Sequence, residues 1–315
     1  MGLMIALMPA HLTSRVQPFL RLFKDAFDLF RQNDPLRLAS STAFFTLFAL
    51  PPILILIISL LSVLFNDALI TGELFEKLTS LVGENVAGQI ELILTNFLEL
   101  QGNGWAAILS FLFLTFVSTT LFTVIQNSLN QLWSIKIKGH QHLRGALRNR
   151  FRALLIIFSS GLLFLAFLVI DGSLAFLNDH YIFWDEHVQL HVLQFINRVI
   201  GFAVETAWFA IIFRFLPFGH MPKRAVWVGA AVTALLFLLG KMVLARVLVN
   251  SDLGSLYATS GSIVVLLLFI FYSAMIFFFG ACFTLVYSRY INQPLRPKHF
   301  ATFFEWRDTE QAPLL

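Results

Sequence analysis

Four ionisable residues lie deep inside long apolar stretches of this sequence, Asp171, Arg198, Glu205 and Lys241, and Arg246 lies near the outer end of one stretch, where it can snorkel to the headgroups. A charged side chain within a membrane-spanning helix costs about 2.5–3.5 kcal/mol on insertion scales, so such residues are candidates for function. Glu205, near the middle of its stretch, could be a hydrogen-bonded buried carboxyl or a site of proton or cation coupling. The other three fall in the outer half of the membrane, counting 1.5 Å per residue. If they share a face, they form a net positive pocket for a lipid phosphate or another anion; otherwise the cations can snorkel to headgroups.

Two adjacent prolines, Pro51 and Pro52, stand inside the apolar run 44–65, FFTLFALPPILILIISLLSVLF. Proline lacks a backbone N–H and its ring crowds the carbonyl four residues earlier, so the carbonyls of Leu47 and Phe48 lose their helical partners. In lipid these carbonyls must be satisfied by protein or water. The prolines therefore predict either a broken helix that lines a cavity, as in many transporters, or a structural kink.

The remaining polar residues offer no catalytic constellation. His140 and His142 lie two apart on a basic loop with no carboxylate nearby, which is not the spacing of metal ligands on a helix. Phosphate-binding and dinucleotide-binding fingerprints are also missing. We therefore expect a protein that is not an enzyme and that has no cofactor and no metal site. Asn130 is expected to pack between helices or to anchor the cytoplasmic mouth of a transport path, and Trp133 to be an interface aromatic.

The elements that must position these residues are membrane-spanning helices. Of the 315 residues, 58% are hydrophobic and 13% are charged, about half the charged share of a soluble domain. The single cysteine excludes a disulfide framework. Crossing the bilayer core takes about 20 apolar residues. Six stretches meet this condition: about 38–65, 104–127, 153–177, 192–216, 225–248 and 262–287.

The loops between these stretches alternate in charge. Lys and Arg gather before the first span, between spans 2 and 3, between spans 4 and 5, and after the last span, whereas the loops after spans 1 and 3 are acidic. Because basic loops stay in the cytoplasm, both termini are expected there. The net charge of +4 follows from this pattern, and no recognition module accompanies it, so nucleic acid is not an expected partner.

These signals predict an all-α integral membrane protein in three parts. Residues 1–35 form a cytoplasmic segment with a basic amphipathic helix on the membrane surface. Residues 36–290 form the six-helix domain, with an outer helical hairpin at 68–100, and residues 291–315 form a cytoplasmic tail. The apolar face of the amphipathic helix is expected to hold Val16, Phe19, Leu20, Phe23, Phe27 and Phe30. Close helix approach is expected at Gly229, Gly240, Gly261 and Gly280.

An ordered set of short motifs resembles the YihY/virulence factor BrkB family of six-helix bacterial inner-membrane proteins. The set begins with TAFFTLFALPPILILI and continues with SLNQLW, FRFLP, VGAAVTALLFLLGK and SLYATSGSIVVLLLFIFYSAMIFFFGA, and it covers about residues 34–287. Pro52 and Asn130 stand at positions that match the family's proline and asparagine. The resemblance implies the fold and an inner-membrane location. Roles in serum resistance and in envelope lipid or ion movement are suggested for the family, which was once labelled a tRNA-processing ribonuclease.

Three functions follow from these observations. The first is transport of an anionic lipid, another amphiphile or an ion, with membrane lipids as partners; it rests on Pro51, Pro52, Glu205 and the outer basic group. The second is a non-catalytic envelope scaffold, as a homo-oligomer or with other envelope proteins. The inherited ribonuclease label is the least favoured. The residues name neither the substrate nor the energy source.

Overall fold

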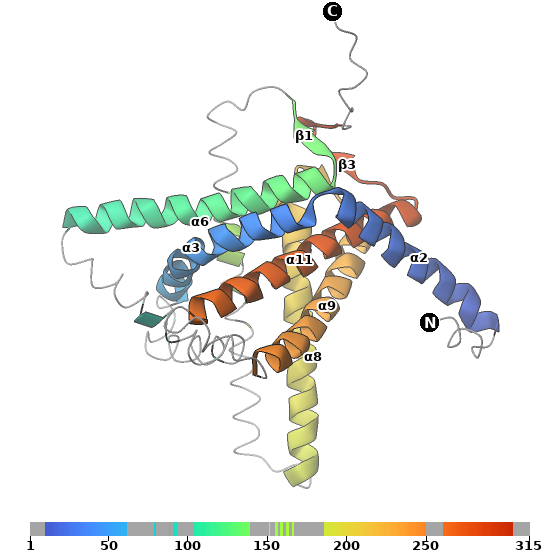
Figure 1. Ribbon diagram of the computed structural model, residues 1–315, viewed down its shortest axis with the longest axis horizontal. Coiled ribbons are helices and arrows are strands. Elements are labelled where there is room, and N and C mark those ends of the chain that lie inside the picture. The colour runs from blue at the N-terminus through green and yellow to red at the C-terminus, as the bar shows by residue number, and fades with distance from the viewer. Residues whose placement is uncertain are drawn as a thin grey trace, which may run out of the picture.

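The computed structural model describes residues 10–61, 104–138, 186–249 and 261–304, with a few single positions between 79 and 166. Six long helices dominate this part of the chain (Figure 1): α2 (Ala10–Gln32), α3 (Pro35–Leu61), α6 (Gly104–Leu132), α8 (Glu186–Phe215), α9 (Lys223–Val249) and α11 (Gly261–Tyr290). The expected third span, 153–177, is described only at scattered positions, and most of the expected hairpin at 68–100 lies outside the described residues.

Three of the described helices are long and apolar enough to cross a membrane: Phe195–Phe215, Lys223–Val243 and Leu266–Tyr290. They coincide with the fourth, fifth and sixth expected spans. The helices α3 and α6 cover the first and second, and α3 contains the shorter apolar helix Pro35–Leu50. The chain is therefore a mostly helical membrane protein, and its complete six-span topology stays a prediction.

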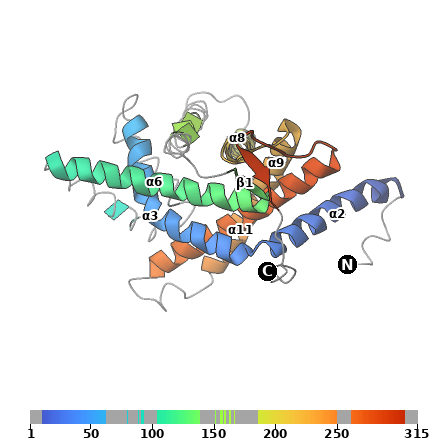
Figure 2. The same cartoon turned by 90° about the horizontal axis from the view of Figure 1, so that it is seen from above.

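The helices converge at one end of the molecule and spread apart at the other (Figures 1 and 2). The largest cluster of buried apolar side chains lies mainly at the converging end and includes Leu129, Phe213, Ala230 and Phe278. Helix α11 packs against α2, α3 and α9, so it is the central element of the bundle. The spreading ends carry exposed apolar side chains such as Phe195 and Val243, as expected of surfaces that face lipid.

Two small antiparallel sheets close the converging end. Strand β1 (Ile135–Ile137) pairs with β4 (Ala301–Phe303), and β2 (Gly219–His220) pairs with β3 (Arg296–Pro297). The start of the expected tail is thus folded onto the segments that follow α6 and α8. These strands are not predictable from the sequence, because such short pairings join segments far apart in the chain and leave no hydrophobic period of their own. The pairings bring three of the basic segments to one side, as the expected alternation of loops requires.

Helix α2 is amphipathic, but its packed face differs in part from the expected one. Leu22, Ala26 and Phe30 are buried, and the ring of Phe23 lies 5.0 Å from that of Phe283 in α11. Leu20 and Phe27 were expected on the same face, yet about half of each side chain is exposed. Packing on α11 therefore takes one flank of the apolar face, and the other flank stays open for the membrane surface.

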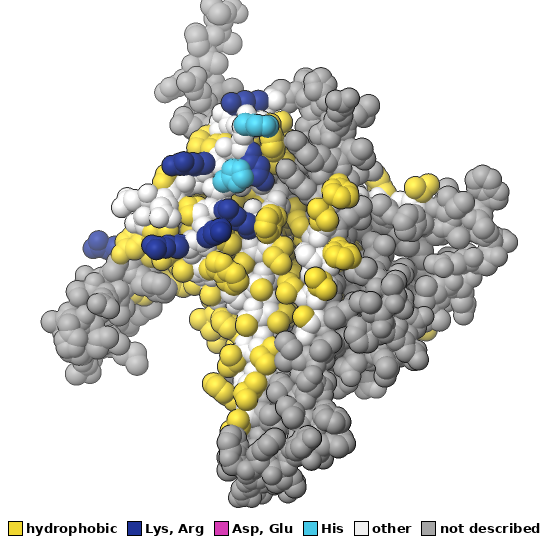
Figure 3. Space-filling model, turned by 180° about the vertical axis from the view of Figure 1, so that it is seen from behind, with side chains coloured by type: hydrophobic (Ala, Val, Ile, Leu, Met, Phe, Trp, Pro, Cys, Tyr) yellow, Lys and Arg dark blue, Asp and Glu magenta, His cyan; other side chains and the backbone are white. Residues whose placement is uncertain are grey.

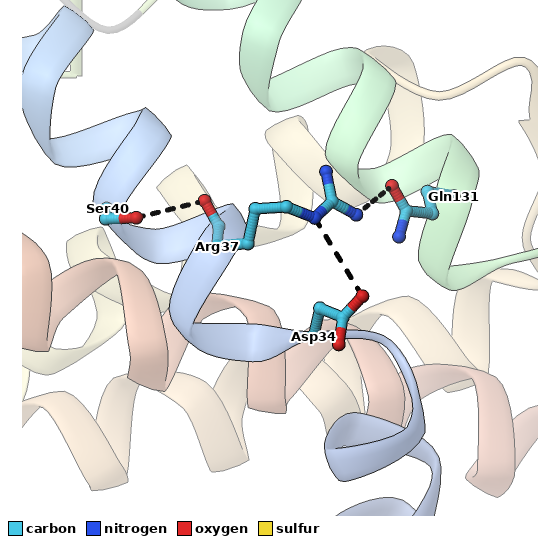
Figure 4. A network of polar contacts seen from close by, with 4 residues as sticks. All are labelled: Asp34, Arg37, Ser40 and Gln131. Carbon is cyan, nitrogen blue, oxygen red and sulfur yellow. Dashed lines mark hydrogen bonds and ion pairs between the residues drawn. The ribbon is translucent and has the colours of Figure 1, made fainter.

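The junction between α2 and α3 is tied to the end of α6 (Figure 4). Asp34, which lies between α2 and α3, has a φ of 49°, a left-handed conformation that aspartate tolerates better than most residues. Arg37, in the first turn of α3, approaches the Asp34 carboxylate at 3.9 Å and donates a 3.2 Å hydrogen bond to Gln131 Oε1. Both charged side chains are exposed, so these contacts fix orientation more than they add stability.

Helices α9 and α11 approach closely through two reciprocal glycine–threonine contacts. A Cβ added at Gly229 would lie 1.9 Å from Thr284 Oγ1, and one added at Gly280 would lie 1.9 Å from Thr233 Oγ1. Each hydroxyl is satisfied within its own helix, since Thr233 and Thr284 donate to the carbonyls of Gly229 and Gly280 at 2.7 Å. Farther along, a Cβ at Gly240 would meet Tyr272 and Ile276. Close approach is confirmed at these three glycines, and the side-chain surroundings of Gly261 lie outside the described residues.

Helix α3 runs through both prolines as one helix. Its axis changes direction in the C-terminal part, which contains Pro51 and Pro52 (Figures 1 and 2). A sharp change of direction is what proline produces when it removes a helical hydrogen bond. The structure thus shows a bent helix and not two separate segments, while the side chains of both prolines lie outside the described residues.

Candidate functional site

The structure brings Glu205 of α8 and Lys241 of α9 into direct contact. Lys241 Nζ lies 2.5 Å from Glu205 Oε1. Both residues belong to helices that can cross a membrane, and the exposed fractions of their side chains are 22% for Lys241 and 28% for Glu205. The ion pair therefore joins two candidate membrane spans, and both of its side chains are partly exposed.

Aromatic side chains hold the lysine in place. Its Nζ also lies 5.0 Å from the ring centroid of Phe237, one turn earlier on α9, at a distance suited to a cation–π contact. The Phe237 ring packs edge-on against Phe209 at 6.0 Å and Phe269 at 6.5 Å. Since these partners come from α8 and α11, three helices fix the position of the ammonium group. The adjacent Met242 is half exposed, so the pair sits close to a lipid-facing surface.

The contact with Glu205 assigns Lys241 to a different group from Arg198, with which the sequence had placed it. Depth counting put Lys241 with Arg198 in an outer basic group and left Glu205 alone. That count treats the helices as straight and parallel, whereas α8 and α9 are inclined to one another (Figure 1), so residues of different nominal depth come together. Arg198 is exposed on the spreading half of α8, and Asp171 lies outside the described residues.

Asn130 anchors the turn between α8 and α9. It is buried near the end of α6, and its Oδ1 accepts a 2.9 Å hydrogen bond from the backbone N–H of Phe218. One turn earlier, Gln126 Nε2 donates to the carbonyl of Leu216 at 2.5 Å. Two amides of one helix therefore satisfy backbone groups where α8 ends, a place where helices leave such groups unpaired.

The C-terminal segment reinforces the same turn. Lys298 donates from Nζ to the carbonyl of Pro217 at 2.7 Å, and its backbone N–H donates to the carbonyl of Phe218 at 2.9 Å. Trp133 was expected at the membrane interface, but it is buried and donates from Nε1 to the carbonyl of Ala281 at 3.1 Å. The indole packs in the core of the bundle and not at the membrane interface, because β1 and its partner β4 cover the end of α6.

The converging end carries a basic surface. Figure 3 shows Lys, Arg and His side chains gathered there, above an apolar region, and no Asp or Glu among the described side chains of the visible face. The segments 133–138, 214–224 and 289–304 contain no Asp or Glu. Their basic residues are Lys136, Lys138, Arg214, Lys223, Arg224, Arg289, Arg296 and Lys298.

Sequence reasoning found Glu205, Lys241 and Asn130 as single residues and missed their partners. Intramembrane charge was the signal for the first two, and a family motif for the third. The Glu205–Lys241 contact spans 36 positions, and it depends on the relative rotation of two helices, which no period in the sequence encodes. Within the described residues, no group of three or more His, Cys, Asp and Glu side chains could hold a metal ion.

Comparison with known families agrees with this architecture. The model of a family described as Virulence factor BrkB matches residues 26–302, which include all the described helices except the first part of α2. Neither the comparison with curated proteins nor that with solved structures found a significant match. On the strength of a match over most of its length, the chain belongs to the virulence factor BrkB family of membrane proteins.

Proposed function

We propose that the protein translocates an anionic amphiphile, such as an anionic lipid, across the bacterial inner membrane, with Lys241 and Glu205 as its polar site. The observation that supports this is the ion pair itself, formed by two spans and still about a quarter exposed. Two apolar helices do not need such a pair to stay together, since apolar replacements of a buried pair are often equally stable. Intramembrane ionisable residues are more often part of a pathway or binding site.

The exchange at this site would proceed through the two charges in turn. An anionic headgroup binds Lys241 in place of Glu205. The released carboxylate is then unpaired in a medium of low dielectric constant, where a charge is far less favourable than its neutral form, so Glu205 takes up a proton. The unit that moves is an anion together with a proton, with no net charge. A small anion would exchange in the same way, so an ion is the alternative cargo.

We propose that the converging end faces the cytoplasm, with both termini on that side. The support is the charge of the segments 133–138, 214–224 and 289–304, which carry Lys and Arg but no Asp or Glu, because Lys and Arg near span ends stay on the cytoplasmic side. The expected hairpin at 68–100 would then lie outside.

A non-catalytic scaffold is the second candidate, and the basic surface at the converging end favours it. Basic segments such as 133–138 and 289–304, which contain no Asp or Glu, suit a partner of opposite charge. In that case charge-neutralising changes at Lys136, Lys138 and Arg296 would abolish function in cells, and a change at Lys241 would not. Neither candidate requires catalysis, and the ribonuclease label is the least supported of the three.

The test is a flux assay in proteoliposomes with acyl-labelled phosphatidylglycerol, labelled phosphatidylcholine and chloride as separate cargoes. We expect the protein to move phosphatidylglycerol across the membrane faster than the other two cargoes. Lys241→Met should slow this movement about tenfold or more, the effect of losing roughly 1.4 kcal/mol of binding free energy. Lys223→Met, which removes an exposed lysine at the start of the same helix, is the matched control and should leave the rate unchanged. A faster chloride flux would identify an ion as the cargo, and no flux of any cargo would contradict transport.

A further inference from the structure

A groove separates α2 from the last turn of α11. Its volume is about 470 Å³, and its polar lining consists of Asp25, Asp28 and Gln32 of α2 with Arg289 and Tyr290 of α11. Its apolar lining includes Leu22, Leu29 and Val286. The groove therefore combines an apolar floor with charges of both signs.

Among the described residues, the charged side chains of this groove have no partner. Within the described residues, neither Asp25 nor Asp28 forms an ion pair with Arg289, and none of the three has a side-chain hydrogen bond. Opposite charges that line one groove without pairing can bind a ligand without first losing an internal contact. Such a site suits a ligand that carries a positive and a negative group close together.

The groove also has a defined level relative to the membrane. It lies at the end of a membrane-spanning helix and beside α2, whose Leu20 and Phe27 leave an apolar stripe exposed, as in helices that lie at the headgroup level. Tyr290 is more than half exposed at the same end, where aromatic residues favour the interface. The zwitterionic molecules most abundant at this level are phospholipids.

From these observations we infer that the groove between α2 and α11 binds the phosphoethanolamine headgroup of a phospholipid. The primary ammonium donates hydrogen bonds to Asp25 and Asp28, and the phosphate is held by Arg289. Charge-assisted hydrogen bonds of this kind are stronger than neutral ones. Phosphatidylcholine lacks N–H donors and phosphatidylglycerol lacks the cation, so both bind less well. This site is separate from the Lys241–Glu205 pair, and it holds α2 against the bundle whatever the protein translocates.

The test uses the purified full-length protein in detergent, titrated with short-chain phosphatidylethanolamine, phosphatidylcholine and phosphatidylglycerol in mixed micelles. We expect phosphatidylethanolamine to bind about tenfold more tightly than the other two, a difference that one lost charge-assisted contact can produce. The double variant Asp25→Asn with Asp28→Asn should remove this preference. Arg289→Gln should weaken the binding of phosphatidylethanolamine and of phosphatidylglycerol alike. Asp34→Asn and Arg31→Gln, outside the groove lining, are the matched controls.

Each other outcome overturns the inference. Equal affinity for the three lipids, or an unchanged preference in the double asparagine variant, would show that the groove does not distinguish one lipid headgroup from another. If water-soluble phosphoethanolamine binds as tightly as phosphatidylethanolamine, the groove is a site for a soluble ligand. If phosphatidylglycerol binds more tightly than phosphatidylethanolamine, the groove is a site for an anion. The altered side chains are exposed, so the variants should fold; their melting temperatures without lipid verify this. Binding is measured without flux, so the result is independent of the transport assay.

Discussion

At the scale of single residues, Lys241 and Glu205 are the groups on which the proposed transport depends. Their contact at 2.5 Å and their intermediate exposure can be read as a structural brace or as a site whose partners exchange. The two readings differ in what happens when both charges are removed together, because a brace only has to hold α8 against α9. A site needs the charges themselves.

The double variant Glu205→Leu with Lys241→Met separates these readings. It removes both charges and keeps apolar volume, so the thermal stability in detergent should equal or exceed that of the parent protein. Translocation of labelled phosphatidylglycerol should nevertheless be lost. Glu205→Leu alone leaves Lys241 without its partner and should destabilise the protein by about 1–3 kcal/mol, less than the loss for a fully buried pair. Normal transport by the stable double variant would reduce the pair to a brace.

At the scale of elements, α9 and α11 behave as one unit because threonine and glycine interlock twice. Overpacking a tight contact typically costs about 1–3 kcal/mol. Gly280→Ala places a methyl group against Oγ1, Cβ and Cγ2 of Thr233, all within 3 Å, and we expect a lower melting temperature. Thr233→Gly removes all three atoms, so the variant carrying both changes should recover stability. Gly88→Ala, with nothing within 4 Å of the added Cβ, is the control; if it destabilises equally, the close contact is not the cause.

The bend of α3 gives a second prediction at this scale. Changing Pro51 and Pro52 to Ala restores two backbone donors and removes two ring clashes, each substitution being worth up to about 3 kcal/mol of helix continuity. We expect a straighter α3 and equal or higher thermal stability, with reduced transport. Pro52→Ala should account for most of the loss. If the stabilised double variant fully complements a deletion strain, the bend is a structural kink only.

The elements also show what sequence could and could not predict. Five of the six expected spans correspond to helices or lie within them, because apolar runs of this length are a strong signal. The relation between Glu205 and Lys241 was not predictable, since it depends on how α8 and α9 incline. The strands at 135–137 and 301–303 were missed because only their mutual pairing makes them strands. Asn130 was found by its motif, while its partner, the N–H of Phe218, carries no side-chain signature.

At the scale of the whole molecule, the helices meet at a basic, strand-closed end and separate toward the other. This shape places the anchored turns on one side and the exposed apolar surfaces on the other, so motion would be easier at the spreading end. The direction of the molecule in the membrane decides which leaflet that end reaches.

Cysteine labelling of whole cells tests this direction. In a background with Cys282→Ala, we expect an impermeant reagent applied from outside to label Glu84→Cys in the expected hairpin. Lys136→Cys, on the basic surface, should react only after the membrane is opened. The reverse pattern would place the basic end outside and contradict the proposed topology.

The most direct test of the central claim records lipid movement and internal pH together in one proteoliposome sample. Inward movement of labelled phosphatidylglycerol should acidify the interior in the same time course, because each anion bound at Lys241 sends one proton to Glu205. In Glu205→Gln, which cannot give up a proton, any remaining lipid movement should proceed without acidification and without dependence on external pH. Lipid movement that never changes internal pH in the parent protein would contradict the exchange at Lys241 and Glu205.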